Sequence, residues 1–371
     1  MKTKNIFILA INAIALVACS QDRELSYENS PNTPKAIQIR SNLADLAMTR
    51  TFGDASDQTQ SETILSGQYV YAWVEDYDAG AATPSSSPYI NGWLLSANGS
   101  NGFTGTTFYY PSTGHNVDVY CLHGNITGFT TDKTAPAEAV KGTTALASNY
   151  PSSIVHTVMA DQSSAANYAK SDLLIGGVKN VKDLSAAVEV KMVHKLSKIE
   201  VFLKIDDNVT VTGNQLRDAN TKIYILNDNT TATIASLSKP AAPDFTSATS
   251  VDDKSAVIAS YGGTVAASAT TSVTQIQMYK TKTDASADAA ATLPVFAEAI
   301  FVPQTVAANT PFIKVALADG GTLTAKIAET EFKPGLKYVY TVTVKRTGLQ
   351  LSSSIYDWES GATATPDATM D

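Results

Sequence analysis

The cysteines and histidines are the residues of this 371-residue sequence that could do chemistry. Cys121 and His123 lie two positions apart in an apolar-rich segment, and side chains with this spacing share one face of a strand. A cysteine and a histidine can act as nucleophile and base, but the pattern supplies no third group to orient the base. It therefore favours a buried, inert thiol beside a structural histidine.

Metal and phosphate sites are not indicated by the other polar residues. None of the four histidines pairs with another His, a Cys or a carboxylate at metal-ligand spacing. Gly176-Gly177 and Gly262-Gly263 lack a following Lys-Ser/Thr pair, so we interpret both as turns rather than phosphate loops. His194 falls on the apolar side of a strand and is interpreted as a core residue. The sequence predicts a protein that is not an enzyme and that uses no cofactor or metal.

Cys19 ends a segment that is typical of export. A basic start and a short apolar run precede it, and this run is too short to span a membrane. Residues 16–19 (LVAC) resemble a bacterial lipobox, in which the cysteine thiol carries lipid and becomes the new N-terminus. An ordinary secretory peptide with an incidental cysteine is the alternative. With Cys19 lipidated, Cys121 has no cysteine to pair with in the exported chain.

Two similar segments frame the rest of the chain. Residues 37–46 (IQIRSNLADL) and 349–358 (LQLSSSIYDW) align at one constant offset, and both begin with the alternation of a half-buried strand. Two segments with one side-chain pattern could fill the same groove. We therefore hypothesise that the first is a removable plug and that the second replaces it from a neighbouring molecule. Chance similarity between short alternating strands is the alternative.

The apolar residues of these segments are the candidate site residues. Those of the plug strand are Ile37, Ile39 and Leu43, and those of the donor strand are Leu349, Leu351, Ile355 and Trp358. In strict alternation Trp358 falls on the face opposite Ile355, so the matched portion either contains a bulge or ends at Leu43 and Ile355.

A removable plug needs a cleavage site between it and the body. Polar residues 20–35 are typical of a flexible tether, and Arg50-Thr51 follows the plug strand as a site for a trypsin-like protease. Arg40 is the competing arginine, but it lies within the strand, where a paired backbone resists cleavage. We therefore expect processing between Arg50 and Thr51.

Composition and periodicity favour an all-β fold. Charged residues make up only 17% of the chain, while Thr, Ser, Tyr and Val, which suit strands and polar turns, are abundant. Short alternating segments separated by turn residues are typical of a β-sandwich. Residues 132–170 lack periodicity and predict long loops with at most one short helix. The alternation changes phase between Leu196 and Ile199, which predicts a bulge at Ser197-Lys198.

The charge argues against nucleic acid as a partner. The whole chain has a formal net charge of −8. Removing residues 1–50 leaves 21 basic and 31 acidic residues, and 21 − 31 gives −10. A body this acidic repels a phosphate backbone.

Several segments together resemble the fimbrillins, the type V pilins of Bacteroidales. Residues 172–175 (DLLI), followed by 190–201 (VKMVHKLSKIEV), are similar to the middle signature of that family. Residues 334–344 (PGLKYVYTVTV), continuing to 355–358 (IYDW), are similar to its C-terminal block. With the lipobox, the resemblance extends over essentially the whole chain.

The resemblance implies an all-β protein with two transthyretin-like β-sandwich domains in tandem, long loops and few short helices. The expected divisions are a signal peptide at 1–18, a propeptide with the plug strand at 19–50, and domains at 51–186 and 187–371. The resemblance further implies lipidation at Cys19, trimming by an arginine-specific protease, and polymerisation by donor-strand exchange.

The expected role is a structural stalk subunit of a cell-surface fimbria that supports adhesion. The expected partners are other copies of the chain and related pilins, the arginine-specific protease, a host or bacterial surface receptor, and the outer membrane through the precursor lipid alone. Two alternatives are a tip or anchor adhesin of the same fimbria, and a surface lipoprotein that never polymerises and binds glycans through Trp73 or Trp93.

Overall fold

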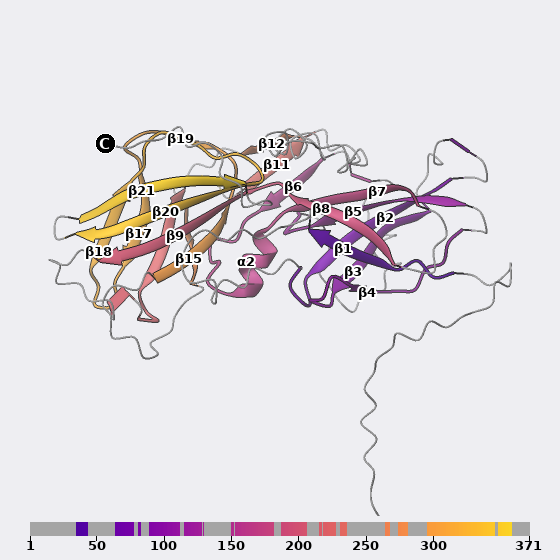
Figure 1. Cartoon of the computed structure of the whole chain (residues 1–371), viewed down its shortest axis with the longest axis horizontal. Helices are drawn as coiled ribbons and strands as arrows, with labels where there is room; N and C mark the ends of the chain where they lie inside the picture. Colours follow the sequence, from indigo (N-terminus) through magenta and orange to yellow (C-terminus); the bar gives the residue numbers. More distant parts are fainter. Residues whose placement is uncertain are drawn as a thin grey trace, which may run out of the picture. The chain divides into compact units, whose positions relative to one another are not determined.

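Nearly all of the regular structure is β-strand, with one short helix, α2 (Ala165–Ser171), in the described part of the chain (Figure 1). This finding confirms the predicted all-β sandwich class. The structure, a computed structural model, describes residues 35–43, 64–77, 81–82, 89–111, 115–127, 129, 150–151, 153–181, 187–205, 215–216, 218–227, 231–235, 264–267, 274–280, 295–345 and 348–357.

The first sheet has seven strands. In spatial order they are β1 (Ile39–Leu43), β8 (Val188–His194), β7 (Leu174–Val181), β5 (Asn116–His123), β2 (Tyr69–Tyr77), β3 (Ile90–Ala97) and β4 (Phe103–Thr104). Neighbouring strands are antiparallel except β1, which runs parallel to β8. One buried cluster, which includes Val70, Trp93, Val119 and Val190, packs on one face of this sheet.

The remaining strands form four smaller sheets. The five-stranded sheet contains β14 (Tyr279–Lys280), β15 (Val295–Phe301), β9 (Ser197–Ile205), β20 (Leu336–Lys345) and β21 (Gly348–Asp357). The four-stranded sheet contains β13 (Thr274–Gln277), β10 (Lys222–Asn227), β17 (Pro311–Ala316) and β18 (Thr322–Lys326). The others are β12 (Thr264–Ala267), β11 (Thr231–Ala235) and β6 (Ile154–Thr157), and the pair β16 (Thr305–Val306) and β19 (Thr330–Glu331).

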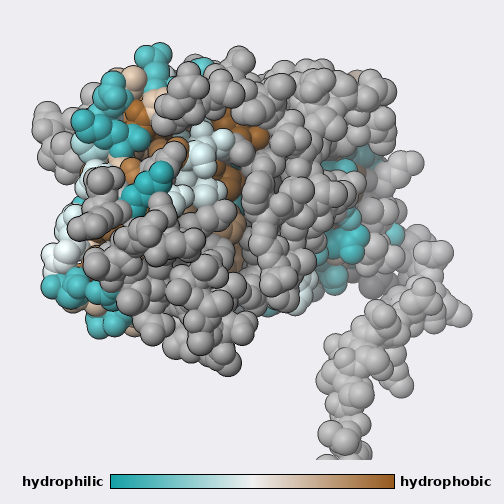
Figure 2. Space-filling view, turned by 60° about the vertical axis from the view of Figure 1, so that its left-hand side comes forward, coloured by the Kyte–Doolittle hydropathy of each residue, from teal (hydrophilic) through white to brown (hydrophobic). Residues whose placement is uncertain are grey.

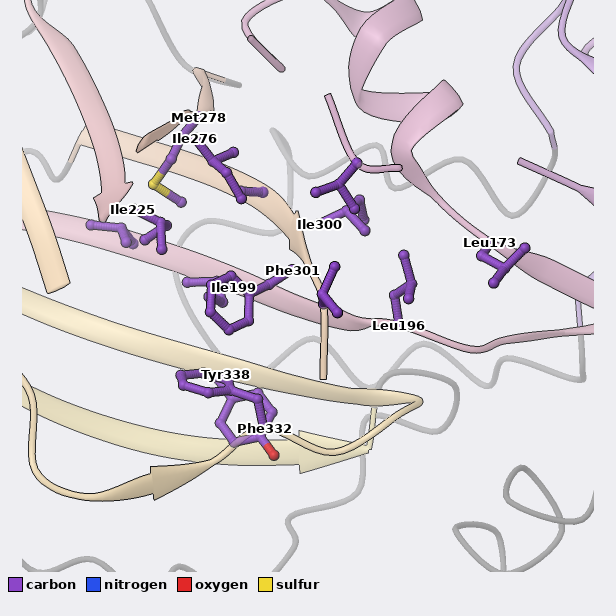
Figure 3. Close-up of a cluster of buried hydrophobic side chains, with 14 of the residues drawn as sticks. Leu173, Leu196, Ile199, Ile225, Ile276, Met278, Ile300, Phe301, Phe332 and Tyr338 are labelled. Carbon is purple, nitrogen blue, oxygen red and sulfur yellow. The ribbon is translucent and has the colours of Figure 1, made fainter. Parts of the chain in front are cut away.

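The five- and four-stranded sheets share one buried hydrophobic cluster. Ile199 of β9 and Ile225 of β10 belong to it, together with an aromatic group around Phe332. The Phe332 ring lies 4.7 Å from the ring of Phe301 and 4.6 Å from that of Tyr338, centroid to centroid (Figure 3). Such ring pairs stabilise a core beyond their area of burial.

The chain passes from one sheet to another between His194 and Ser197. β8 ends in the seven-stranded sheet, whereas β9 pairs with β15 and β20 from its first residues without a register shift. The predicted bulge at Ser197-Lys198 is therefore wrong. The change of phase marks a change of sheet, because two strands in different sheets each keep their own alternation.

A buried ion cluster lies on the five-stranded sheet near α2. Lys198 of β9 contacts Glu200 (3.0 Å) and Glu298 of β15 (2.6 Å), and Lys337 of β20 lies 3.6 Å from Glu200. Burial alone would lower the pKa of Lys198, but the charges of Glu298, Tyr168 on α2, and Glu200 raise it well above its usual value. The ammonium therefore stays charged and links two of the sheet's central strands.

Gly176 is part of a strand rather than a turn, which corrects our interpretation. It lies in β7, opposite Cys121 of β5 and Met192 of β8. A Cβ at this position would overlap with the carbonyl oxygen of Lys191 and lie 2.6 Å from Met192 Cγ. Only glycine lets the two strands approach this closely.

We predict that Gly176→Ala lowers the free energy of unfolding by about 1–3 kcal/mol, because the added methyl overpacks the contact between β7 and β8. Chemical denaturation measures the change. Gly321→Ala is a suitable control, since its backbone is not in the positive-φ region and the nearest atom to its Cβ, Leu317 Cδ1 at 3.2 Å, is the end of a flexible side chain. A Gly176→Ala protein as stable as the parent chain would contradict the close packing.

Candidate functional site

The candidate site is the place that β1 occupies between the two edges of the seven-stranded sheet (Figure 1). On one side β1 is parallel to β8, with Ile39 opposite Val188 and Leu43 opposite Met192. On the other side, antiparallel bridges join Arg40 to Gly102 and Ala36 to Tyr109. β1 thus covers polar backbone groups that would otherwise be exposed along both edges.

The side chains at positions 37, 39 and 41 point into the core. Ile37 and Ile39 are 3% and 4% exposed, Ser41 is 1% exposed, and both isoleucines belong to the same buried cluster as Trp93. Burying two such side chains contributes ~3–6 kcal/mol by the usual scale. Leu43, the third predicted plug residue, occupies the next odd position of the strand.

Backbone hydrogen bonds attach the segment on both sides. The amide of Val188 donates to the carbonyl oxygen of Gln38 (2.7 Å), which faces β8. On the other side the amide of Ile37 donates to Phe108 (2.8 Å), and that of Ser41 donates to Asn101 (2.8 Å). Each such bond is worth ~0.5–1.5 kcal/mol net, so the strand is held mainly by burial and backbone pairing.

Arg40 lies on the outer face of β1. Its guanidinium pairs with Glu189 of β8 at 2.9 Å, and the two side chains are 54% and 36% exposed. An ion pair this exposed is worth ~0–1 kcal/mol. The backbone of Arg40 lies within the paired strand, as the sequence predicted, whereas Cys19, Arg50 and Thr51 lie outside the described residues.

The predicted donor segment forms β21, the last strand of the five-stranded sheet. It pairs with β20 along its whole length, from Gly348 opposite Lys345 to Asp357 opposite Leu336. Its inner face packs on the core, where Leu351 is 9% exposed and Leu349 and Ile355 are partly buried. Trp358 lies outside the described residues. Figure 2 shows the side of the molecule that carries this sheet. Hydrophobic and hydrophilic residues are mixed on its surface there.

The offset that aligns the two sequences also aligns the faces of the two strands. Along β1 and the residue pair before it, the odd positions 37, 39, 41 and 43 carry Ile, Ile, Ser and Leu. Along β21 the odd positions 349, 351, 353 and 355 carry Leu, Leu, Ser and Ile. Both strands therefore present two apolar residues, a serine and an apolar residue at positions of one parity.

Three of the four histidines gather at the C-terminal end of α2. His123 contacts the carbonyl oxygen of Ala169 (3.1 Å), and His156 contacts that of Ser171 (2.8 Å). His194 contacts the carboxylate of Asp172 (2.8 Å). Donors at this end of a helix satisfy its last carbonyl groups and favour its dipole. These histidines therefore anchor α2, which no spacing in the sequence revealed.

Cys121 and His123 do not form a reactive pair. Cys121 is fully buried among apolar residues, and burial raises the pKa of its thiol to about 12. His123 faces the carbonyl oxygens of Tyr69 (2.6 Å) and Ala169. A thiol that stays protonated at neutral pH is a poor nucleophile.

Other candidate sites offer little within the described residues. No group of three or more His, Cys, Asp or Glu side chains there could hold a metal ion. Trp73 and Trp93 are 1% and 4% exposed, so neither forms the open platform considered for glycans. None of the described helical segments is long and apolar enough to cross a membrane.

Comparison with known protein families identifies the chain. The family model described as Fimbrillin-like matches residues 65–358. The chain belongs to the fimbrillin-like family. The match confirms the resemblance seen in the sequence; it runs from just before β2 to just past β21, and it leaves out β1.

One solved structure shows the same fold as this fimbrillin-like chain, and others are similar at lower TM-scores. A cell adhesion protein from Bacteroides ovatus is 16% identical, with 88% of this chain and 98% of that chain covered and a TM-score of 0.53. A cell adhesion protein from Bacteroides uniformis is 18% identical (87% and 98% covered, TM-score 0.48). The C-terminally truncated tip fimbrial protein Mfa3 from Porphyromonas gingivalis is 10% identical (88% and 100% covered, TM-score 0.38). No curated protein matches the chain.

We predict that the fimbrillin-like chain loses stability in acid through His156. This histidine is fully buried near Asp172 and His123, and burial lowers its pKa to about 4 from a usual value of 6.5. As the pH falls below 6.5 the unfolded chain takes up the proton first, so stability is lost down to about pH 4, by roughly 3 kcal/mol in total.

The measurement is urea denaturation in steps between neutral pH and pH 4. His156→Gln keeps a donor near the carbonyl of Ser171 and removes the titration, so its acid loss should be smaller. His115→Gln serves as control, because His115 pairs with Asp76 (2.9 Å) away from α2. Equal acid slopes in the parent chain and in His156→Gln would contradict this role.

Proposed function

We propose that the chain is a stalk subunit of a cell-surface fimbria and that its subunits join by exchange of the strand at the β1 position. Membership of the fimbrillin-like family supports the fimbrial role and the location at the cell surface. The observation that carries the exchange is the position of β1, which lies between two sheet edges and shares the pattern of its inward face with β21.

The proposed pathway begins with export as a lipoprotein through Cys19, which holds the precursor at the outer membrane. An arginine-specific protease then cuts between Arg50 and Thr51. While it is attached, β1 refills its place at the high effective concentration of a tethered segment, about millimolar for a short linker. Once the chain is cut, β1 is no longer tethered and can dissociate permanently. Residues 51–186 and 187–371 are the proposed domains, and β8 of the second range pairs into the sheet of the first.

The place of β21 in its own sheet and the place of β1 offer a strand different backbone partners. β21 in its own sheet has one neighbouring strand, β20, whereas the place of β1 offers partners on both sides. A donor strand that moves there gives up its ten-residue pairing with β20, and it gains five-residue pairing with β8 and bridges on a second side. Each backbone bond is worth ~0.5–1.5 kcal/mol. The donor's Leu349, Leu351 and Ile355 would take the positions of Ile37, Ile39 and Leu43, so the apolar burial is closely matched.

A tip or anchor subunit is the alternative within the same fimbria. One observation favours it: β21 is paired with β20 of its own chain over ten residues. Such a subunit would accept a strand at the β1 position and would keep its own β21 in place. Mixing the chain with other subunits would identify this role if the chain accepts a strand at the β1 position but never donates its own β21.

We predict that Arg50→Ala keeps the precursor monomeric, because uncut β1 continues to occupy its place. Size-exclusion chromatography after protease treatment measures this, and N-terminal sequencing of the cut parent chain should begin at Thr51. Arg40→Ala is the matched control and should be cut and polymerise normally. Normal polymers from the Arg50→Ala protein would rule out this cleavage site.

We also predict the register of the incoming strand. At the offset of the two segments, Ser352 takes the place of Arg40, directly opposite Glu189. A cut chain with Glu189→Cys mixed with a cut chain with Ser352→Cys should therefore form a disulfide between chains, since opposed residues of neighbouring strands are close enough for one.

Non-reducing electrophoresis measures the linked pair. Ser353→Cys is the matched control, because residue 353 belongs to the opposite face and should link poorly to Glu189→Cys. The native Cys121 stays unreactive through its burial. Equal linking through residues 352 and 353, or no linking in polymers that do form, would exclude this register.

A further inference from the structure

Two strand pairs in the described part of the chain are parallel, whereas the other strand pairs there are antiparallel. The first is β1 with β8, matched from Ile39 opposite Val188 to Leu43 opposite Met192. The second is β9 with β20, matched over eight residues of each strand. Each parallel pair therefore contains one of two strands, β8 and β9, that follow one another in the chain.

The connection between β8 and β9 is short and buried. It consists of Lys195 and Leu196, which are 1% and 0% exposed. Leu196 belongs to the buried cluster drawn in Figure 3, and its carbonyl oxygen accepts from the amide of Gly335 at 2.8 Å. The amide of Lys195 donates to the carbonyl oxygen of Leu173 at 2.9 Å. Tension on β8 would therefore reach the N-terminal end of β9 directly, because no loop lies between the strands to extend first.

The proposed exchange would pull on these strands from defined ends. A donor segment is connected to its own subunit through its N-terminal end, since β20 precedes β21 in the chain. In the proposed register that end lies beside Val188, at the start of β8, whereas β8 continues into β9 from its other end. The receiving chain passes the tension on from the C-terminal end of β20, where its own donor segment begins.

Each parallel pair would therefore be pulled from opposite ends. The incoming strand is pulled from its N-terminal end and β8 from its C-terminal end. In the same way β9 is pulled from its N-terminal end and β20 from its C-terminal end. Strands pulled in this way must slide past one another, so their backbone hydrogen bonds share the tension and break together. In antiparallel pairs the two pulled ends would lie side by side, and the bonds would open one at a time.

The pair of β9 and β20 is also reinforced at the end that receives the tension. Lys198, the second residue of β9, contacts Glu200 (3.0 Å) and Glu298 of the neighbouring β15 (2.6 Å). Lys337 of β20 lies 3.6 Å from Glu200. These contacts link β9 to both of its neighbours. Water competes for exposed hydrogen bonds, but Lys198 and Glu200 are only 2% exposed, so water has little access here.

We propose that the chain carries mechanical tension along β8, β9 and β20, and that the parallel pair of β9 and β20 is its mechanical clamp. The direction of the tension rests on the proposed function. The resistance of the clamp does not, because the single uncut chain already contains both strands.

Single-molecule force spectroscopy of the full, uncut chain tests the proposal. DNA handles attached through Glu189→Cys and Lys345→Cys pull β9 and β20 from opposite ends. Handles attached through Glu189→Cys and Lys333→Cys pull both strands from one end. Both proteins carry Cys19→Ser, and the native Cys121 is fully buried, so the handles attach at the introduced thiols. Forced unfolding reports the rate of unfolding under tension, and the rupture force should be several times higher for the first protein.

The second protein is a matched control, because the two differ only in which end of β20 is pulled. Lys333 lies beside the start of β9, where its carbonyl oxygen accepts from the hydroxyl of Ser197 at 2.8 Å. The side chains of Glu189 and Lys333 are 36% and 55% exposed, so their replacement disturbs no core contact. Urea denaturation should give the same free energy of unfolding for both proteins, which separates a lower rupture force from misfolding.

Equal rupture forces in the two proteins, or a lower force when residue 345 is pulled, would overturn the proposal. A chain with a strong clamp that never polymerises would reject the proposed function alone. A chain that polymerises but ruptures at equal forces would reject the clamp alone.

Discussion

The seven-stranded sheet depends on one strand, β1, whose two edges must both be paired at the same time. β1 pairs with β8 on one side and is bridged to residues 102 and 109 on the other, while Ile37 and Ile39 complete the core beneath. Without such a strand, both edges would present unpaired backbone groups next to an apolar strip that contains Trp93. Exposed edges of this kind associate readily with other strands. A strand in this place therefore stabilises the sheet.

The connectivity of β1 explains how another strand could fill it. β1 is parallel to β8, and parallel neighbours cannot be joined by a tight hairpin. Its neighbours in space lie at residues 188–192 and 101–110, far from residues 39–43 in the chain. No short turn therefore ties β1 to either partner. In the proposed exchange, a strand delivered by another molecule would meet the same side-chain pockets and backbone groups as β1 itself, with no chain connection to rebuild.

Local patterns in the sequence revealed the strands but not the sheets to which they belong. Alternation correctly indicated strands around residues 37–43, 188–205 and 349–357, because side-chain period depends on the strand alone. In the sequence, the segment from His194 to Ser197 resembled a bulge, because a change of sheet and an inserted residue both shift the phase of the apolar alternation. The close approach at Gly176 and the ion cluster around Lys198 arise from residues far apart in the chain. The spacing of residues within a short stretch of sequence does not predict such contacts.

The serine on the inner face of β1 sets the balance of the proposed exchange. An isoleucine in place of Ser41 would add ~1.5–3 kcal/mol of apolar burial, and the unpartnered hydroxyl costs ~1–3 kcal/mol in addition. β1 is thus weaker by several kcal/mol than a wholly apolar strand in the same place. β21 carries Ser353 at the matching position, so the donor has the same weakness. Because the two occupants are closely matched, the tether of β1, rather than a better-fitting side chain, would decide which one stays.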